Sequence, residues 1–419
     1  MSVLIIGAAG AVGKKLVRAL AARGEAVVAS DRMSKLPRNI EQIASATEPN
    51  VDVRDVDNLR RLFEKHPDVK TVWNLAAPLS VETALRPKVA EEITIGGMNN
   101  LLTVMAETGT RKICFTDSIG SFGKSAPREN CSARWLRENP TQDPGSDYGI
   151  QKRGCRELMA RFKSEKGGDP RFAVLPGVLH SEALWGSGTT EYALEALQAA
   201  ATGNEFICPV EPDVKLPMLY VDDLMRGMIA LQDAEESQLH EPDHGYCIPG
   251  LAFTANELFA EIRQHYPHFS YRVELDENIN KFANYWPNSL SGEEAARDLN
   301  FRPRVSLPEM VDNVLAGHEK RRSRAAAAFT GADADGNERL DKEELEGLLA
   351  TFLRLPHHLQ SQRSDIIEKL AEDFFEKMDA NGDGVICMED FQNWSKTHSI
   401  QDLVDDYSRG WEKGMEATK

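Results

Sequence analysis

The first 130 residues alternate short apolar segments with segments whose apolar residues recur at helical spacing. Short apolar runs bounded by polar residues are typical of buried strands, and a 3.6-residue period is typical of amphipathic helices. Their regular alternation predicts a parallel α/β sheet covered by helices. The predicted strands are Val3–Gly7, Ala26–Ser30, Thr71–Leu75, Lys112–Thr116 and Phe172–Leu175, and the predicted helices include Lys14–Arg23 and Leu59–Lys65.

The pattern changes twice further along the chain. After Pro176 it becomes irregular, which is typical of substrate-binding segments added to a sheet, and we place that region mainly at 176–300. A basic and then alanine-rich stretch follows, which we interpret as a helical end or linker at 321–328; a nucleic-acid patch is the alternative reading. From residue 329 to 419, Asp-rich loops lie between helical segments. We therefore predict a domain at 1–320, a linker and a second domain at 329–419.

Charge and composition exclude several classes of protein. The net charge is −17, and residues 331–419 hold 21 acidic against 10 basic residues, so neither part has the basic surplus of a nucleic-acid binder. No run of about 18 apolar residues is present, so we expect no membrane span. The first strand begins directly after Met1, which predicts no presequence and a cytoplasmic protein. The six cysteines are scattered, as expected of free thiols in a reducing compartment.

A glycine-rich turn follows the first predicted strand and opens the first helix. The three glycines are suited to a tight turn, to close approach of a pyrophosphate and to close helix–strand packing, and the helix N-terminus attracts phosphate. This arrangement predicts a Rossmann-type, doubly wound sheet that binds a dinucleotide. The G-x-x-G-x-x-G spacing resembles that of the short-chain dehydrogenase/reductase superfamily. The residues are Gly7, Gly10, Ala11, Val12 and Gly13, with Ala8 and Ala9 between the first two glycines.

Asp31 ends the second predicted strand, 18 residues after Gly13. A carboxylate at this place accepts hydrogen bonds from the adenosine ribose hydroxyls and repels a 2′-phosphate, so the sequence favours NAD over NADP. The neighbouring Arg32 keeps NADP open as the alternative. By resemblance to the superfamily, Asp52 and Val53 read the adenine, and Leu75, Ala76 and Ala77 let the backbone touch the cofactor.

Tyr148 and Lys152 are four residues apart and therefore lie on one face of a helix. Ser118 stands thirty residues upstream, at the end of a predicted strand. A tyrosine is a poor base at neutral pH unless a nearby cation stabilises its phenolate, which the lysine ammonium does. Tyr148 then accepts the substrate hydroxyl's proton, Ser118 holds the same oxygen, and Lys152 also holds the nicotinamide ribose. The order and spacing match the superfamily's Ser–Tyr–Lys trio.

The chain from residue 2 to about residue 318 resembles one branch, the epimerase-like L-threonine 3-dehydrogenases. The resemblance rests on motifs at 76–80, 118–123, 186–193, 215–223 and 286–289. It implies oxidation of the L-threonine side-chain alcohol to 2-amino-3-ketobutyrate without a metal, in a homodimer. It also implies an amino-acid pocket lined by Ser80, Ser118, Tyr148, Thr190 and Trp286.

Three departures from that family lie near the predicted pocket. Thr116-Asp117 stands where the family usually reads Pro-Ser, Val174-Leu175 where it tends to have Arg-Tyr, and Ser291-Gly292 where an acidic pair is common. They leave the substrate less certain than the reaction type. Another β-hydroxy acid, or a nucleotide sugar as in the epimerase branch, therefore remains an alternative.

Two twelve-residue segments near the C-terminus have the ligand spacing of EF-hand calcium loops. Oxygen ligands at positions 1, 3, 5, 7 and 12 suit a hard cation, and a glycine at position 6 permits the sharp turn. The first loop has Glu338 at position 6, which puts its turn in doubt. The second ends in aspartate, whose shorter arm favours Mg²⁺. The predicted ligands are Asp333, Asp335, Asn337, Arg339 and Glu344 in the first loop, and Asp379, Asn381, Asp383, Val385 and Asp390 in the second.

The two loops are expected to pair through a short sheet that joins 339–341 to 385–387. Three hypotheses follow for the whole chain. In the first, Ca²⁺ tunes a working dehydrogenase. In the second, the chain is a calcium-sensing scaffold with a silent nucleotide-binding domain, and in the third the EF-hands are only structural. The intact Ser118, Tyr148 and Lys152 favour the first over the second.

Overall fold

The computed structural model describes residues 1–140, 143–182, 190–333, 335, 337–352, 363–379 and 385–395. The chain divides into two compact units. The first comprises Met1–His180 and Trp185–Asp312, and the second comprises Ser181–Leu184 and Asn313–Lys419. In the described part of the chain, no helix combines the length and apolar character needed to cross a lipid bilayer.

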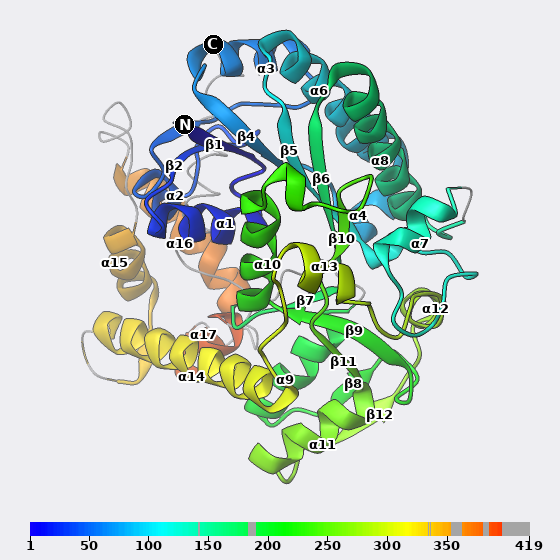
Figure 1. Ribbon diagram of the computed structural model, residues 1–419. Coiled ribbons are helices and arrows are strands. Elements are labelled where there is room, and N and C mark those ends of the chain that lie inside the picture. The colour runs from blue at the N-terminus through cyan, green and yellow to red at the C-terminus, as the bar shows by residue number, and fades with distance from the viewer. Residues whose placement is uncertain are drawn as a thin grey trace. The chain divides into compact units, whose positions relative to one another are not determined.

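A seven-stranded parallel sheet forms the centre of the first unit, as the alternating pattern predicted (Figure 1). Chain order reverses between β1 and β4, which are hydrogen-bonded neighbours. At such a reversal the loops after adjacent strands diverge to opposite faces of the sheet and leave a crevice at the carboxyl ends. The spatial order is β10 (Gly245–Cys247), β6 (Asp169–Leu175), β5 (Lys112–Ser118), β4 (Val69–Asn74), β1 (Ser2–Ile6), β2 (Ala26–Ser30) and β3 (Ala46–Glu48).

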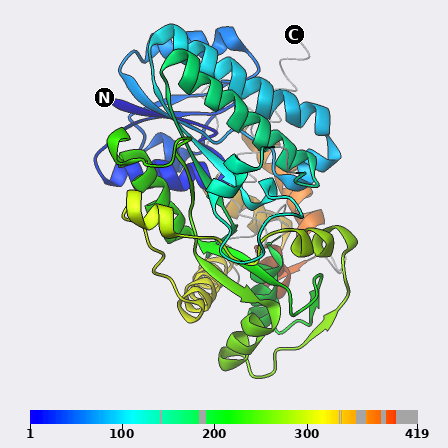
Figure 2. The same cartoon turned by 45° about the vertical axis from the view of Figure 1, so that its right-hand side comes forward.

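Helices cover both faces of this sheet, and the turned view in Figure 2 separates the two layers. The strands are accordingly apolar on both sides; all five residues of β1 are buried. One layer contains α1 (Ala11–Ala22) and α10 (Val221–Asp233), and the other contains α3 (Val56–Lys65), α6 (Gly97–Thr108) and α8 (Asp147–Lys166). The α1 stripe of Leu16, Val17 and Leu20 is fully buried in the core that includes Ile5 and Val27.

Shorter elements connect the sheet to the substrate-binding region. In sequence order they are α2 (Arg38–Glu41), α4 (Ser80–Leu85), α5 (Pro87–Glu91), the π-helix η1 (Glu92–Gly96), the 3₁₀-helix η2 (Ile119–Ser121) and α7 (Ala133–Glu138). A three-stranded sheet follows, of β11 (Leu251–Thr254), β9 (Lys215–Tyr220) and β7 (Gly177–Leu179).

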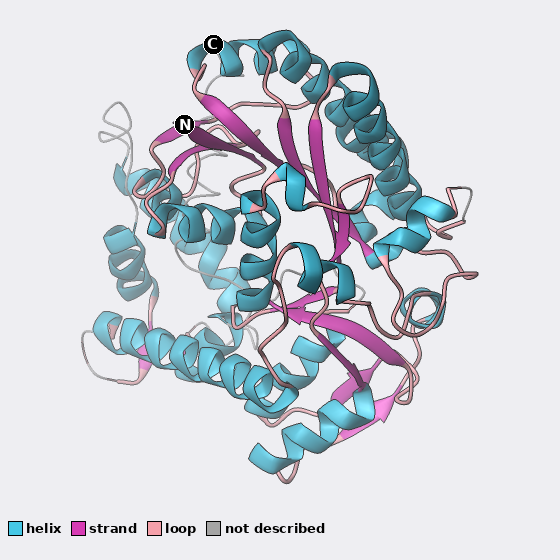
Figure 3. Ribbon diagram, viewed as in Figure 1, coloured by secondary structure: helices cyan, strands magenta, loops and turns pink. Residues whose placement is uncertain are grey.

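The region after residue 176 is therefore a small α/β part with its own sheets, visible as short magenta strands in Figure 3. It also contains the pair β12 (Tyr271–Val273) and β8 (Phe206–Cys208). Its helices are α9 (Tyr192–Thr202), the 3₁₀-helix η3 (Glu236–Gln238), α11 (Ala255–His265), α12 (Glu277–Tyr285) and α13 (Glu293–Asp298).

The second unit is helical around one two-stranded pairing. β13 (Arg339–Leu340) pairs antiparallel with β14 (Ile386–Cys387), with Arg339 opposite Cys387. This confirms the short sheet predicted between the two loops. A separate apolar core surrounds it, with Phe329 and Phe391 in edge contact at 5.6 Å between ring centroids. The helices are α14 (Leu307–Ala332), α15 (Lys342–Phe352), α16 (Arg363–Met378) and α17 (Met388–Ser395).

The segment predicted as a helical end or linker, 321–328, lies inside the continuous helix α14. The division between the two compact units falls earlier, between Asp312 and Asn313. Alanine and arginine are strong helix formers, so the stretch extends the preceding helix. The cysteines agree with the sequence: all six are unpaired.

Candidate functional site

The glycine-rich turn after β1 has the backbone geometry that its sequence indicates. Gly7 has φ +84°, a left-handed conformation that residues with a side chain rarely adopt. A Cβ at Gly7 would lie 2.9 Å from the Leu75 carbonyl carbon, and a Cβ at Gly13 would lie 2.2 Å from the Gly7 carbonyl oxygen. Only glycine therefore allows the turn to pass this close to the segment after β4 and to the start of α1.

A cavity of about 400 Å³ opens at this turn, at the carboxyl ends of β1, β2 and β4. The N-terminal end of α1 is capped by Gly10 without a side-chain hydrogen bond. A helix start of this kind offers backbone N–H groups to an anion. Nine of the predicted cofactor residues line the cavity: Gly7, Gly10, Asp31, Arg32, Asp52, Val53, Leu75, Ala76 and Ala77. Gly13 is buried beneath the turn, Ala11 begins α1, and Val12 lines the neighbouring cavity.

Asp31 is 8% exposed, and backbone donors hold its carboxylate in place. One oxygen accepts the N–H of Ala9 at 3.0 Å, from the glycine-rich turn, and the other accepts the N–H of Met33 at 3.2 Å. The carboxylate is thus fixed beside the turn at the end of β2. This position fits an acceptor for the hydroxyls of a ribose whose pyrophosphate lies at the α1 N-terminus, so the residues present fit a dinucleotide.

Asp52 lines the same cavity, but its carboxylate is already paired. Arg54 donates from Nε to both oxygens, at 3.0 and 3.1 Å. These hydrogen bonds hold the pKa of Asp52 below its usual value. The Asp52 carboxylate therefore lines the cavity as one half of an ion pair. Arg54 also lines the cavity, and sequence reasoning missed it because two residues so close in a loop give no periodic signal.

A second cavity, of about 190 Å³, adjoins the first at the ends of β5 and β6. It brings together residues from seven separate segments of the chain. All five predicted substrate residues line it: Ser80, Ser118, Tyr148, Thr190 and Trp286. Trp286 stacks on Phe282 at 5.7 Å between ring centroids, and its indole N–H is buried without a hydrogen-bond partner among the described residues.

Ser118, Tyr148 and Lys152 lie close together. A Cβ built on Gly120 would lie 3.5 Å from the Ser118 hydroxyl oxygen and 3.2 Å from the Tyr148 ring, so Gly120 leaves the space between them open. The Lys152 ammonium is 5.3 Å from the Tyr148 ring centroid and donates to the carbonyl oxygen of Thr116 at 2.8 Å. Lys152 is only 3% exposed, so water screens its charge little.

Three titratable residues in this cavity were not predicted as site residues: Asp117, His180 and Glu191. All three are buried. Asp117 is noted above only as a departure from the family's sequence. In the structure its side chain forms an ion pair with Arg156 of α8 and accepts the Ser118 N–H at 2.8 Å. Its position next to Ser118 in the sequence was the signal that could have identified Asp117 as a site residue. Glu191 lies in the 186–193 motif next to Thr190, which was the available signal, whereas His180 belongs to no motif.

In the second unit, the first predicted calcium loop gathers its carboxylates. Asp333, Asp335 and Glu344 offer oxygens that lie within 4.8 Å of one another. Backbone N–H groups of the loop donate inward: Asn337 to Asp333 at 3.1 Å, and Asp335 to Glu344 at 3.4 Å. The position 12 glutamate thus reaches back across the loop, as an EF-hand ligand does.

Position 6 of this loop adopts the left-handed turn conformation, although it is a glutamate rather than a glycine. Glu338 has φ +63°, in the left-handed region that position 6 normally fills with glycine. Its N–H donates to Asp333 at 3.0 Å. Arg339 follows at position 7, which supplies a backbone carbonyl, and its own N–H donates to Asn337 at 2.8 Å. The loop therefore closes with glutamate in place of glycine, at a cost in backbone strain.

The second calcium loop is described only in part. Asp379 directly follows α16, and its N–H donates to the Phe375 carbonyl oxygen at 2.9 Å. Val385 precedes β14, and Asp390 accepts the Cys387 N–H at 3.0 Å. The predicted ligands Asn381 and Asp383 lie outside the described residues.

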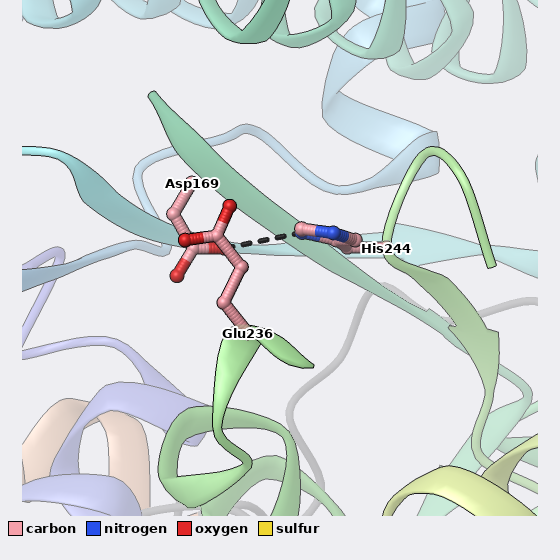
Figure 4. Close-up of side chains that lie close together, drawn as sticks. All are labelled: Asp169, Glu236 and His244. Carbon is pink, nitrogen blue, oxygen red and sulfur yellow. Dashed lines mark hydrogen bonds and ion pairs between the residues drawn. The ribbon is translucent and has the colours of Figure 1, made fainter. Parts of the chain in front are cut away.

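A further cluster of metal-ligand side chains lies at the opposite end of β6 (Figure 4). Asp169, Glu236 and His244 are close together, but Arg171 donates to both Asp169 oxygens, at 3.0 and 2.7 Å. The Lys163 ammonium lies 2.6 Å from Nε2 of His244. Because an ammonium only donates, Nε2 accepts, and Nδ1 donates to Asp169 at 3.1 Å. Protein cations already neutralise this carboxylate, so the cluster is a structural network.

The sequence matches two family descriptions. Residues 3–243 match the "NAD dependent epimerase/dehydratase family", and residues 322–396 match the "EF-hand domain pair". The chain is 31% identical to the mitochondrial L-threonine 3-dehydrogenase of Sus scrofa over 324 residues, which cover 75% of this chain and 82% of that protein.

Solved structures with the same fold cover the first three-quarters of the chain. A GalE-like L-threonine dehydrogenase from Cupriavidus necator, in its holo form, is 30% identical with a TM-score of 0.68, covering 75% of this chain and 99% of that one. A UDP-glucose 4-epimerase from Thermotoga maritima, 21% identical with a TM-score of 0.63, covers 76% of this chain and 99% of that one and shares the fold. The chain is therefore an NAD-dependent oxidoreductase of the epimerase/dehydratase family, L-threonine 3-dehydrogenase-like, joined to a calcium-binding EF-hand pair.

Proposed function

We propose that this protein oxidises the side-chain hydroxyl of L-threonine to the ketone of 2-amino-3-ketobutyrate, with NAD as the hydride acceptor. The observation that carries the proposal is the cavity at the ends of β5 and β6, in which Ser118 and Tyr148 lie beside a buried lysine. Its volume of about 190 Å³ suits an amino acid better than a nucleotide sugar. The likeness to L-threonine dehydrogenases supports the same substrate.

In the proposed mechanism, Tyr148 acts as the general base. The buried Lys152 ammonium stabilises the phenolate form of Tyr148, which accepts the proton of the threonine hydroxyl. Ser118 donates a hydrogen bond to the same oxygen and orients it. The neighbouring cavity, lined by Gly7, Gly10 and Asp31, would hold NAD, which would supply the acceptor for the hydride. The two cavities adjoin at the glycine-rich turn and at the segment after β4, so the proton and the hydride have separate destinations.

The polar ends of a zwitterionic substrate have suitable partners in the same cavity. The hydroxyls of Ser80 and Thr190 and the buried indole N–H of Trp286 are hydrogen-bond donors for a carboxylate. Glu191 lies beside Thr190, and its carboxyl group is a hydrogen-bond partner for an ammonium group. We therefore propose that recognition uses both charged ends of the amino acid.

For the second unit, we propose that the first loop binds Ca²⁺ in the protein's working state and that occupancy changes the rate of the dehydrogenase. The support is the convergence of Asp333, Asp335 and Glu344 in a closed loop. A calcium-insensitive structural appendage is the alternative. The unpaired thiols support a reducing compartment, and we propose the cytosol.

A substrate panel tests the proposed reaction. The full-length protein is mixed with NAD and L-threonine, L-allo-threonine, L-serine, 3-hydroxybutyrate or UDP-glucose, and NADH formation is followed by absorbance. We expect L-threonine to give the highest kcat/KM. Of these compounds, only L-threonine combines both charged groups with a secondary alcohol in the configuration of the proposed substrate. Faster turnover of a substrate without an amino group would reject the proposal.

Replacing Tyr148 with phenylalanine removes the hydroxyl and leaves the ring in place. We expect kcat to fall by roughly 10²–10⁴, the usual contribution of a general base, while NAD binding measured by fluorescence titration stays nearly unchanged. Tyr285→Phe, which alters a tyrosine outside the cavity lining, is the control. Turnover retained in Tyr148→Phe would remove this residue from the mechanism.

Asp31→Asn tests the choice between NAD and NADP. The amide keeps an acceptor for the Ala9 or Met33 N–H but loses the charge that repels a 2′-phosphate. We expect the ratio of kcat/KM for NAD over NADP to fall by about tenfold, the equivalent of roughly 1.4 kcal/mol. Steady-state kinetics with both cofactors measures the ratio. An unchanged ratio would show that Asp31 does not discriminate between them.

Glu338→Gly relieves the left-handed strain in the first calcium loop. Because that strain costs roughly 1 kcal/mol or more, we expect Ca²⁺ to bind about fivefold more tightly by isothermal titration calorimetry. Glu338→Gln is the matched control, since it removes the same charge but keeps the Cβ. Equal affinity in the two variants would contradict the strain argument.

Calcium regulation is tested by following NADH production while free Ca²⁺ is raised through the micromolar range. We expect the rate to change with a midpoint equal to the calorimetric Kd of the first loop. Glu344→Gln, which weakens the position 12 ligand, should move that midpoint to higher Ca²⁺. A flat response in the wild-type chain would favour a structural appendage.

A further inference from the structure

A third cavity of the first unit shares no lining residue with the two described above. It has a volume of about 560 Å³ and lies between α8, α7, β6 and the turn before β10. We call it the α8 cavity. Small-molecule sites in proteins usually enclose about 300–1,000 Å³, so it is large enough for a ligand.

The floor of the α8 cavity is apolar. Leu136, Met159 and Phe172 line it and are each only 2% exposed, so their side chains turn into the protein rather than outward. Three prolines, Pro140, Pro170 and Pro242, add rigid apolar surface. A surface of this kind favours the apolar body of a ligand, because burying it releases water from both partners.

The rest of the lining is mainly cationic. Two carboxylates, Glu157 and Asp243, stand against four basic side chains: Arg137, Arg153, Arg156 and Lys163. The side chains of Arg137 and Asp243 are paired with each other at 3.2 Å, and those of Arg153 and Glu157 at 3.8 Å. The charge that remains is positive.

Lys163 is the basic side chain here with no carboxylate at ion-pair distance in the described part of the chain. Its ammonium donates to the Pro242 carbonyl oxygen at 2.9 Å and to His244 Nε2 at 2.6 Å. An ammonium has three donors, so one is left for a ligand. Burial lowers the pKa of Lys163 because it penalises the charged ammonium, and the nearby carboxylates of Glu236, Asp169 and Asp243 offset only part of this cost. A bound anion would relieve that cost.

We propose that the α8 cavity is a second ligand site, which binds a small amphipathic carboxylate with its apolar body against Met159 and Phe172 and its carboxylate at Lys163. A single negative charge matches the one donor that Lys163 has left. We do not expect a compact, fully hydrated anion such as phosphate to bind against the apolar floor, because the floor has no polar group to replace the water that hydrates the anion.

The α8 cavity is connected to the proposed active site by one ion pair. Arg156 lines the α8 cavity, whereas Asp117, its ion-pair partner, lines the substrate cavity. Asp117 in turn accepts the Ser118 N–H at 2.8 Å and the Ser121 hydroxyl at 2.5 Å. A carboxylate that draws Arg156 toward itself would weaken this hold on Ser118. We therefore expect the ligand to change turnover, and this expectation, unlike binding itself, rests on the proposed function.

Binding is tested directly, without reference to the reaction, by isothermal titration calorimetry of octanoate into the full-length protein saturated with NAD. We expect saturable binding with a Kd below about 1 mM, and none by 1-octanol, which lacks the charge. Lys163→Met should weaken octanoate binding at least tenfold. Lys166→Met makes the same change three residues later on α8, outside the cavity, and should leave binding unchanged.

A second variant covers the case in which Lys163→Met disturbs folding. Ala160 is exposed on α8 and lines the cavity, so Ala160→Trp fills it without burying a new group in the core. We expect this variant to keep its basal activity and lose octanoate binding. The proposal is overturned if octanoate fails to bind, if 1-octanol binds equally, or if neither variant weakens binding. Binding without any change in NADH production would uphold the site and reject its coupling to Ser118.

Discussion

The Lys152 ammonium is buried on α8, donates to the Thr116 carbonyl oxygen and lies 5.3 Å from the centre of the Tyr148 ring. A cation in such surroundings interacts strongly with any charge that develops nearby, because little water is present to screen it. The proposed chemistry depends on this interaction. In the proposed mechanism this cation is the partner of the tyrosine oxygen next to Ser118, and the arrangement requires that α8 be packed firmly against β5.

The sheet topology provides that packing and also joins the two cavities. Chain order reverses between β1 and β4, so the turn after β1 and the segment after β4 meet at the same edge. Gly7 and Gly13 allow this approach, since a Cβ at either would overlap backbone atoms. The dinucleotide cavity at β1, β2 and β4 thereby adjoins the substrate cavity at β5 and β6. An oxidation that passes hydride from one to the other needs this adjacency.

The charged side chains at the carboxyl ends of the strands are paired differently from those at the amino end of β6. At the carboxyl ends, Asp31 is held by backbone donors, and Lys152 by a backbone carbonyl, so both keep their charge available to a ligand. At the amino end of β6, Asp169 is neutralised by Arg171 and bonded to His244. The second cluster therefore stabilises the fold, while the first remains open to chemistry. The first calcium loop of the second unit relies instead on gathered carboxylates, those of Asp333, Asp335 and Glu344.

The sequence by itself determined the elements and the motifs. The alternating apolar pattern predicted β1, β2, β4, β5 and β6, because the sheet is covered on both faces and its strands are therefore mainly apolar. The glycine spacing, the four-residue spacing of Tyr148 and Lys152 and the ligand spacing of the calcium loops were visible because they are local. Each of these spacings reflects a structural requirement that involves only a few neighbouring residues.

Only the tertiary structure decided which distant side chains meet. Arg54 covers the Asp52 carboxylate, Arg156 pairs with Asp117, and His180 joins the substrate cavity, and none of these contacts leaves a periodic trace in the sequence. Glu338 is a similar case. The sequence shows that position 6 of the loop is a glutamate, but its left-handed backbone follows from the closure of the whole loop. Side-chain partners depend on packing between elements far apart in the chain, whereas spacing within one element fixes only which residues share a face.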